Sequence, residues 1–215
     1  MYFLGHWFSW FQLLELQFTS IAVRFGVQIP MRINEAIVLA AGASKRLGSP
    51  KALVEVKGQT LVELIYGKLQ NAGLSVTVVT RNSLKQKIQD LHPNVSVIVN
   101  PNPDLGRTGT IQCGIESIGI KPLLIVPVDR PGFSLDTVNK LCECNDTTIP
   151  AFNEKGGHPI AITSKDCENI LRAESDTPLR EIISPDRITV EDPHLHLNID
   201  TKEDVNELVK VAKHL

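Results

Sequence analysis

The chain has 215 residues, of which 42% are hydrophobic and 21% are charged, and its formal net charge is −2. This composition excludes an intrinsically disordered protein, which would have fewer apolar residues or a larger net charge. A chain of this length can bury a core without disulfides or a structural metal. The near-neutral charge argues against a general nucleic-acid binder, so no nucleic-acid partner is expected.

The four cysteines indicate a reducing compartment. No pair has the two-residue spacing of a zinc site, and Cys142 and Cys144 are too close for a usual metal clip. Free thiols are typical of the cytosol, so the sequence predicts a cytoplasmic protein.

Residues 1–30 differ in composition from the rest of the chain, because they hold both tryptophans and only two formal charges. They do not resemble a signal peptide, since no Lys or Arg precedes the apolar run. Polar residues within the run disfavour a membrane span: His6, Gln12, Glu15 and Gln17. An amphipathic surface anchor is a remaining alternative, although the basic face of such helices is missing. We expect residues 1–30 to be an extension outside the fold, residues 31–215 to form a single domain, and no membrane partner.

From residue 35 onward, hydrophobic periodicity and capping signals predict alternating strands and helices. The expected strands span residues 35–40, 75–80, 95–99, 123–128, 147–152, 159–163 and 195–199. The expected helices span residues 61–71, 83–91, 110–118, 134–144, 164–172 and 178–183, with a last helix after residue 201. Such alternation predicts an α/β fold with right-handed crossovers and a mostly parallel sheet. Ligands of these sheets bind at the carboxyl ends of the strands, here the loops after residues 40, 80, 99 and 128.

The loop after the first strand, residues 39–51, has the composition of a phosphate-binding loop. It is neither a dinucleotide fingerprint nor a Walker A loop, because the glycine spacing of both is absent. Three small residues let a base and a triphosphate approach the backbone: Ala40, Ala41 and Gly42. Three cations follow within seven residues: Lys45, Arg46 and Lys51. The alternative is a solvated surface loop whose charges have no function, but small residues and cations directly after a buried strand favour a polyphosphate site.

The same loop, read as L-A-A-G-x-S-x-R-[LM]-G-x-P-K, resembles the signature of nucleotidyltransferases similar to molybdenum cofactor cytidylyltransferase and guanylyltransferase. The resemblance continues in family order through four further segments: Asn100 to Gly106, Val128 to Pro131, Gly157 to Pro159, and Asn198 to Asp204. It covers essentially residues 33–213. It implies a Rossmann-like three-layer sandwich of the nucleotide-diphospho-sugar transferase type.

The resemblance also implies an activity. Such enzymes transfer a nucleotidyl group from a nucleoside triphosphate to a phosphate on a small-molecule acceptor and release pyrophosphate. Magnesium fits this chemistry, because it binds a few carboxylates together with substrate oxygens. The implied partners are therefore a nucleoside triphosphate, Mg²⁺ and a phosphorylated acceptor, with molybdopterin expected as the acceptor.

The expected catalytic residues are Lys51, Arg46 and Asp129. Asp129 lies where the apolar strand 123–128 would open into the cleft, although an Asp before Arg-Pro also suits a turn. Asp200 is the second expected metal ligand, with helix entry as its alternative role. The remaining contacts to nucleotide or acceptor are expected from Leu39, Ala40, Ala41, Gly42, Ser44, Arg46, Lys51, Asn100, Gly106, Thr110 and His158. For His158, a purely structural role is an equal alternative.

Several departures from the family pattern affect the choice of substrate. The segment Thr108-Gly-Thr110 stands where the family often has a Ser, and Arg130 stands where relatives frequently have Gln. Relatives that use GTP commonly have two glycines in the loop and an acidic residue before the lysine, whereas this chain has Ala41 and Pro50. The loop thus favours CTP. The alternatives are a sugar- or polyol-phosphate nucleotidyltransferase and a nucleotide-binding protein without turnover, while a redox enzyme would need the missing glycine fingerprint.

Overall fold

The computed structural model describes residues 31–44 and 47–211. The expected extension of residues 1–30 lies outside the described residues, and so do Lys45, Arg46 and residues 212–215. Among the helices of the described part, none is long and apolar enough to cross a membrane.

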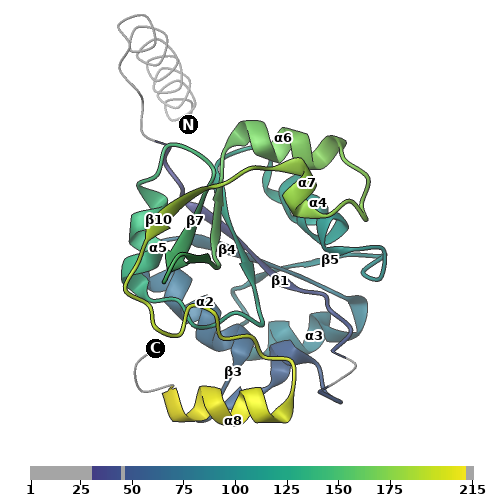
Figure 1. Ribbon diagram of the computed structural model, residues 1–215. Coiled ribbons are helices and arrows are strands. Elements are labelled where there is room, and N and C mark those ends of the chain that lie inside the picture. Colours follow the sequence, from purple (N-terminus) through teal and green to yellow (C-terminus); the bar gives the residue numbers. More distant parts are fainter. Residues whose placement is uncertain (1–30, 45–46, 212–215) are drawn as a thin grey trace, which may run out of the picture.

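Strands and helices alternate through most of the described chain (Figure 1). The strands are β1 (Glu35–Ala40), β2 (Glu55–Val56), β3 (Gln59–Thr60), β4 (Ser75–Thr80), β5 (Ser96–Val99), β6 (Leu123–Pro127), β7 (Thr148–Phe152), β8 (Lys155–Gly156), β9 (Ile160–Ile162) and β10 (Asp186–Thr189). The helices are η1 (Lys51–Leu53), α2 (Leu61–Asn71), α3 (Asn82–Leu91), α4 (Arg107–Ile118), α5 (Leu135–Cys142), α6 (Ser164–Arg172), α7 (Leu179–Ile182) and α8 (Lys202–Val211).

Eight of the described strands form one sheet in the order β10-β7-β9-β6-β1-β4-β5, with β8 attached to β7. The pairs β6–β1, β1–β4, β4–β5 and β10–β7 are parallel, while β9 runs antiparallel to both β6 and β7. The expected mostly parallel sheet is therefore confirmed. Its parallel strands bring the loops after β1, β4, β5 and β6 to one edge.

The sheet has a hydrophobic core on each face. Along β1, Ala36 and Val38 pack into one core and Ile37 and Leu39 into the other, because successive side chains of a strand point to opposite faces. Helices α2, α3, α5 and α8 contribute to the first core, and α4 and α6 contribute to the second. Figure 1 shows α2, α3 and α8 on one side of the sheet and α4, α6 and α7 on the other. This is the expected three-layer sandwich.

The capping residues in the sequence correctly predicted the start of α2. Thr60 Oγ1 accepts a hydrogen bond from the Glu63 amide at 3.3 Å, and the Glu63 carboxylate accepts one from the Thr60 amide at 2.7 Å. This capping box satisfies two amides of the first turn. Helix α4, in contrast, begins three residues earlier than expected, at Arg107, because Gly106 serves as its N-cap with a φ of +151°.

The strand expected at residues 195–199 is absent from the described structure. Its apolar residues alternate as in a strand, but turn bonds run from the Leu195 amide to the Asp192 carbonyl and from the Leu197 amide to the His194 carbonyl. Leu195 and Ile199 are buried from a loop instead. One edge of the sheet is formed by β10, whose polar sequence Asp-Arg-Ile-Thr carries no strand pattern.

Candidate active site

The loop after β1 is closed by Ser44. Its Oγ accepts a hydrogen bond from the Lys51 amide at 2.9 Å, so the start and the end of the loop are held together. Ser44 has a φ of +50°, a left-handed conformation that turns the chain sharply. At Gly42, nothing lies within 4 Å of the position a Cβ would take, so this side of the backbone faces open space.

Arg81, which was not among the expected site residues, holds this loop against the sheet. Its Nε and Nη2 donate hydrogen bonds to the Ala41 carbonyl at 2.9 and 2.7 Å. Thr80 Oγ1 donates to the Ala40 carbonyl at 3.1 Å. In the sequence, the feature that could have identified Arg81 as a site residue is its position directly after β4, at the carboxyl end of a parallel strand. These bonds fix the backbone that leads into the exposed residues Gly42 and Ala43.

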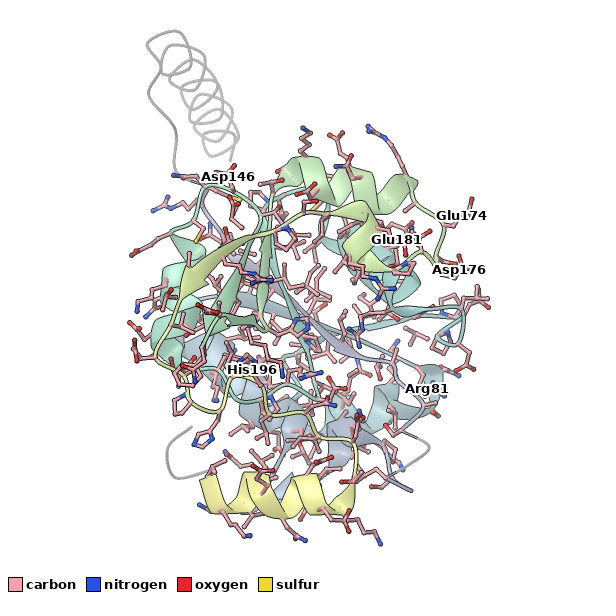
Figure 2. All side chains as sticks on the ribbon, in the orientation of Figure 1. Arg81, Asp146, Glu174, Asp176, Glu181 and His196 are labelled. Carbon is pink, nitrogen blue, oxygen red and sulfur yellow. The ribbon has the colours of Figure 1, made fainter. Side chains whose placement is uncertain are left out.

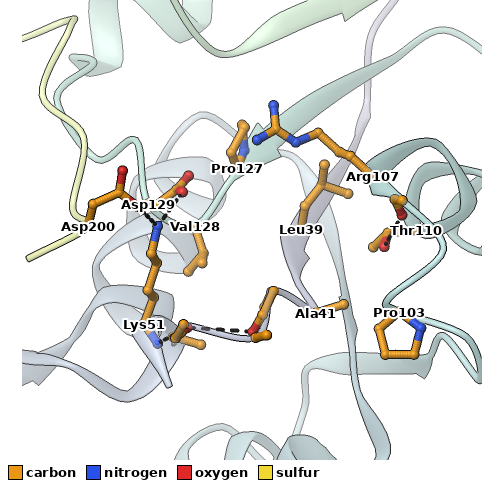
Figure 3. Close-up of a pocket in the computed structure, with 16 residues that line it drawn as sticks. Leu39, Ala41, Lys51, Pro103, Arg107, Thr110, Pro127, Val128, Asp129 and Asp200 are labelled. Carbon is orange, nitrogen blue, oxygen red and sulfur yellow. Dashed lines mark hydrogen bonds and ion pairs between the residues drawn. The ribbon is translucent and has the colours of Figure 1, made fainter. Parts of the chain in front are cut away.

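Lys51, Asp129 and Asp200 meet at one end of this loop (Figure 3). Lys51 Nζ donates to Asp129 Oδ2 at 2.9 Å and also bonds to Asp200 Oδ1. All three side chains are half-buried. The Ile199 amide donates to the Asp129 carbonyl at 2.9 Å, and Asn198 Nδ2 donates to Asp200 Oδ2 at 2.6 Å. The C-terminal segment is thereby tied to the end of β6, and the two carboxylates share one cation.

A cavity of about 340 Å³ opens beside this group. It is lined by ten of the expected site residues: Leu39, Ala40, Ala41, Gly42, Ser44, Lys51, Gly106, Thr110, Asp129 and Asp200. It is also lined by residues that sequence reasoning missed: Ala43, Ala52, Pro103, Arg107, Pro127 and Val128. Figure 3 shows Lys51 and the carboxylates on one side of this first cavity, with Thr110 and Pro103 on the other. The small residues of the loop after β1 therefore form one wall of the cavity, and Lys51, Asp129 and Asp200 form its charged end.

Two expected site residues lie away from the first cavity, Asn100 and His158, while Arg46 is outside the described residues. Asn100 is buried and does not line the first cavity; its Nδ2 donates to Thr110 Oγ1 at 3.0 Å and its Oδ1 accepts from the Asn102 amide at 2.8 Å, so it shapes the loop after β5. His158 lines a second cavity of about 910 Å³.

The two cavities adjoin at Arg107, which among the described residues is the one that lines both. Burial, together with the nearby cations Arg107 and Arg130, lowers the pKa of His158 to about 4, although the charge of Asp129 opposes this shift. His158 is therefore neutral at neutral pH. Its Nδ1 atom is buried and has no hydrogen-bond partner in the described structure.

Lys68, which was not among the expected site residues, contacts the backbone of the loop after Asp129. Its Nζ donates to the carbonyls of Pro131 and Phe133, both at 2.8 Å, and lies 5.0 Å from the centre of the Phe133 ring. Burial lowers the pKa of Lys68 to about 8, and the charge of Asp192 opposes that shift. The carbonyl contacts fix the direction in which the chain leaves β6.

The donor set fits a magnesium ion that is bound together with phosphate oxygens. In the described residues, no group of three or more His, Cys, Asp or Glu side chains could hold a metal by itself. Magnesium typically uses one or two carboxylates and completes its shell with water and substrate phosphates. Asp129 and Asp200 already converge on one positive charge, the Lys51 ammonium. Two carboxylates facing one open cavity satisfy this requirement.

The sequence matches the MobA-like NTP transferase domain over residues 36–192. The chain belongs to this family. A molybdenum cofactor guanylyltransferase of Xanthomonas euvesicatoria is 32% identical over 120 residues, which cover 55% of this chain and 59% of that protein. A molybdenum cofactor guanylyltransferase of Vibrio atlanticus is 31% identical over 169 residues, which cover 66% of this chain and 86% of that protein.

Solved structures with low sequence identity share the fold of this chain. The structure of Rv0371c from Mycobacterium tuberculosis superposes with a TM-score of 0.70 at 18% identity, covering 83% of this chain and 98% of that one. The same protein was also solved in complex with manganese, and that structure matches with a TM-score of 0.68 at 16% identity, covering 82% and 97%. The chain spans about 60% of the length of the first curated relatives it matches, 59% and 61%.

Proposed function

We propose that this chain is a magnesium-dependent nucleotidyltransferase that transfers a nucleotidyl group from a nucleoside triphosphate to the phosphate of molybdopterin and releases pyrophosphate. The observation that carries the proposal is the convergence of Lys51, Asp129 and Asp200 at the charged end of a cavity whose wall is the small-residue loop after β1. Residues 31–215 would act as one domain.

The chemistry requires positioning and charge neutralisation more than a protein nucleophile. A phosphate oxygen of the acceptor attacks the α-phosphorus in line, a new P–O bond forms, and the bond to the β-phosphate oxygen breaks. The electron pair of the broken bond leaves with pyrophosphate. No covalent bond to the protein is needed at any point.

Lys51 would bind the triphosphate and neutralise charge that builds on the leaving pyrophosphate. The exposed amides of the loop around Gly42 would donate to phosphate oxygens. Asp129 and Asp200 would hold the metal, and Mg²⁺ supplies positive charge at the phosphate oxygens when bound. Arg46 is proposed as a further triphosphate cation from its place in the loop.

The loop sequence and the curated relatives favour different nucleoside triphosphates. The loop residues Ala41 and Pro50 favour CTP, whereas the curated relatives are named guanylyltransferases. The match to the Vibrio protein is 31% identical and covers 86% of that protein, so it outweighs two loop positions, and the proposal takes GTP as the donor.

The acceptor would enter through the second cavity, because this cavity meets the first at Arg107. An acceptor phosphate at that junction would open onto the first cavity, which Asp129 also lines. His158, being neutral, can accept or donate a hydrogen bond there without adding charge.

The test is pyrophosphate release by the full chain with Mg²⁺, GTP, CTP or UTP, and molybdopterin or a panel of sugar and polyol phosphates. Release that requires both GTP and molybdopterin supports the proposal. Release with a sugar or polyol phosphate alone would replace the acceptor. Nucleotide binding without release from any pair would favour a binding protein without turnover.

A further inference from the structure

Three segments of the chain meet where the second cavity joins the first. Strand β9 pairs antiparallel with β6, with Ile160 opposite Ile125, so His158 just before β9 lies beside the end of β6. Arg130 lies in the turn that follows β6. Arg107 begins α4, and Figure 3 shows its side chain extending toward the end of β6. All three side chains line the second cavity at its inner end, which opens onto the first.

Neither of these two arginines is neutralised by a carboxylate. Arg107 forms no hydrogen bond or ion pair with a residue that the structure describes. Arg130 donates to the His196 carbonyl at 3.3 Å, and this backbone oxygen positions the guanidinium group without cancelling its charge. Among the residues that line the second cavity the one carboxylate is Asp176, which packs by its backbone against Gly106. Its exposed side chain pairs with no described cation, and Figure 2 shows it at the outer edge of the molecule.

His158 adds a neutral hydrogen-bonding group beside the two charges. Both guanidinium charges act on its ring and, together with burial, keep its pKa at about 4, so both groups lie near it and the imidazole is neutral at neutral pH. Asp129 also acts on the ring, but its carboxylate is in contact with Lys51. Neither ring nitrogen of His158 has a hydrogen-bond partner among the described residues. The ring can therefore donate to a ligand without adding a third positive charge.

A phosphate monoester matches this group of side chains in charge and in hydrogen-bond acceptors. Above its second pKa of about 6, it carries two negative charges and three terminal oxygens. Planar guanidinium groups bind such oxygens through charge-assisted hydrogen bonds. A phosphodiester carries a single negative charge, so it would leave one of the two arginines without a counterion. Two unneutralised arginines beside one neutral donor thus favour a terminal phosphate.

We propose that Arg107, Arg130 and His158 bind the terminal phosphate of the acceptor as a dianion and thereby select phosphomonoesters over phosphodiesters. The role of this phosphate as the attacking group rests on the proposed function, whereas its binding at this place rests on the three side chains alone. Because Arg107 also lines the first cavity, a phosphate held here faces the site proposed for the nucleotide.

The test measures the binding of two probes to the full chain by isothermal titration calorimetry, without nucleotide or metal and above pH 7. The probes are hexyl phosphate and hexyl methyl phosphate, which differ by one methyl group and one negative charge. We expect the monoester to bind at least about tenfold more tightly. Arg107→Gln and Arg130→Gln should each reduce this preference to about threefold or less, whereas Arg130→Lys, which keeps the charge, should retain part of it.

The matched control is Arg180→Gln, which removes an exposed cation of the same cavity that lies 4.0 Å from Glu181. It should leave the preference for the monoester intact. An equal loss in this control would mean that the probe responds to the general charge of the cavity, which overturns the proposal. Equal affinity of the wild-type chain for the two probes overturns it as well. Circular dichroism verifies the fold of each variant.

A nucleotide analogue locates the probe. With Mg²⁺ and a saturating amount of a GTP analogue that has an α,β-methylene bridge, hexyl phosphate should still bind, because the two ligands occupy different cavities. Complete displacement would place the probe in the first cavity and would overturn the proposal. If the probes behave as expected but no acceptor gives pyrophosphate, the phosphate site stands and the nucleotidyltransferase function fails.

Discussion

Lys51 Nζ lies 2.9 Å from Asp129 Oδ2, although 78 positions separate the two residues in the chain. Lys51 ends the loop after β1 and Asp129 follows the neighbouring strand β6, so the parallel pairing of β1 with β6 brings them together. Asp200 joins them from the C-terminal segment. One positive charge therefore meets two carboxylates in the protein by itself and offsets only part of their negative charge.

Replacing either member of this pair should abolish most turnover. Lys51→Ala and Asp129→Ala are each expected to lower kcat/KM for nucleotide transfer by roughly 100-fold or more, the usual effect of removing a group that stabilises transition-state charge. Lys85→Ala, which removes an exposed lysine of α3, is the control. Steady-state pyrophosphate release measures the rates, and circular dichroism checks the fold. A variant with wild-type rates would have no part in the mechanism.

Divalent metal should bind weakly to the free protein and more tightly when Lys51 is removed. The Lys51 ammonium contacts both carboxylates, so it opposes a second cation at the same place. Lys51→Met is expected to raise the affinity for Mn²⁺, without nucleotide, by roughly tenfold. Titration followed by electron paramagnetic resonance measures free Mn²⁺. An affinity that stays the same or falls would show that these carboxylates do not form the metal site.

Arg81 should act on nucleotide affinity by positioning the loop. Its two hydrogen bonds to the Ala41 carbonyl fix backbone that would face the nucleotide. Arg81→Gln is expected to raise KM for the nucleotide by about tenfold, equivalent to about 1.4 kcal/mol, with a smaller effect on kcat. Arg172→Gln, at an exposed site on α6, provides the comparison. A drop in kcat at constant KM would contradict a positioning role.

Lys68 should make stability depend on pH in the alkaline range. Its pKa is about 8 in the folded protein against 10.5 for the unperturbed side chain, because burial disfavours the charged form. Between these values the unfolded chain binds more protons than the folded one, so stability rises with pH. Relative to Lys68→Met, the wild type is expected to gain about 2 kcal/mol from pH 7 to pH 10.

Urea unfolding of both proteins at several pH values measures this difference. The comparison with Lys68→Met removes contributions from other titrating groups, as long as both proteins unfold in two states. A constant difference between the two proteins across this range would mean that Lys68 keeps its ordinary pKa.

Local features of the sequence were enough for most of the fold. The apolar run of β1, the capping box of Thr60 and Glu63, and the strongly apolar β6 each act over a few neighbouring residues, so their patterns predict elements directly. The polar edge strand β10 was missed for the same reason. It is a strand because β7 offers it hydrogen-bond partners, which no pattern within Asp186–Thr189 reveals.

The candidate site divides in a similar way. The small residues and Lys51 after β1, and Asp129 after β6, could be identified from their positions at strand ends. Arg81 also follows a strand end, but its contact with the Ala41 carbonyl is visible only in the structure. Lys68 and Arg107 could not be identified, because their roles depend on the carbonyls after Asp129 and on the junction of two cavities. By itself, the sequence determined the alternating elements, the family and the loop suited to phosphate. Only the tertiary structure decided that Lys51 meets two carboxylates and that five cationic side chains line the neighbouring cavity, because these groups lie far apart in the chain and come together through the fold.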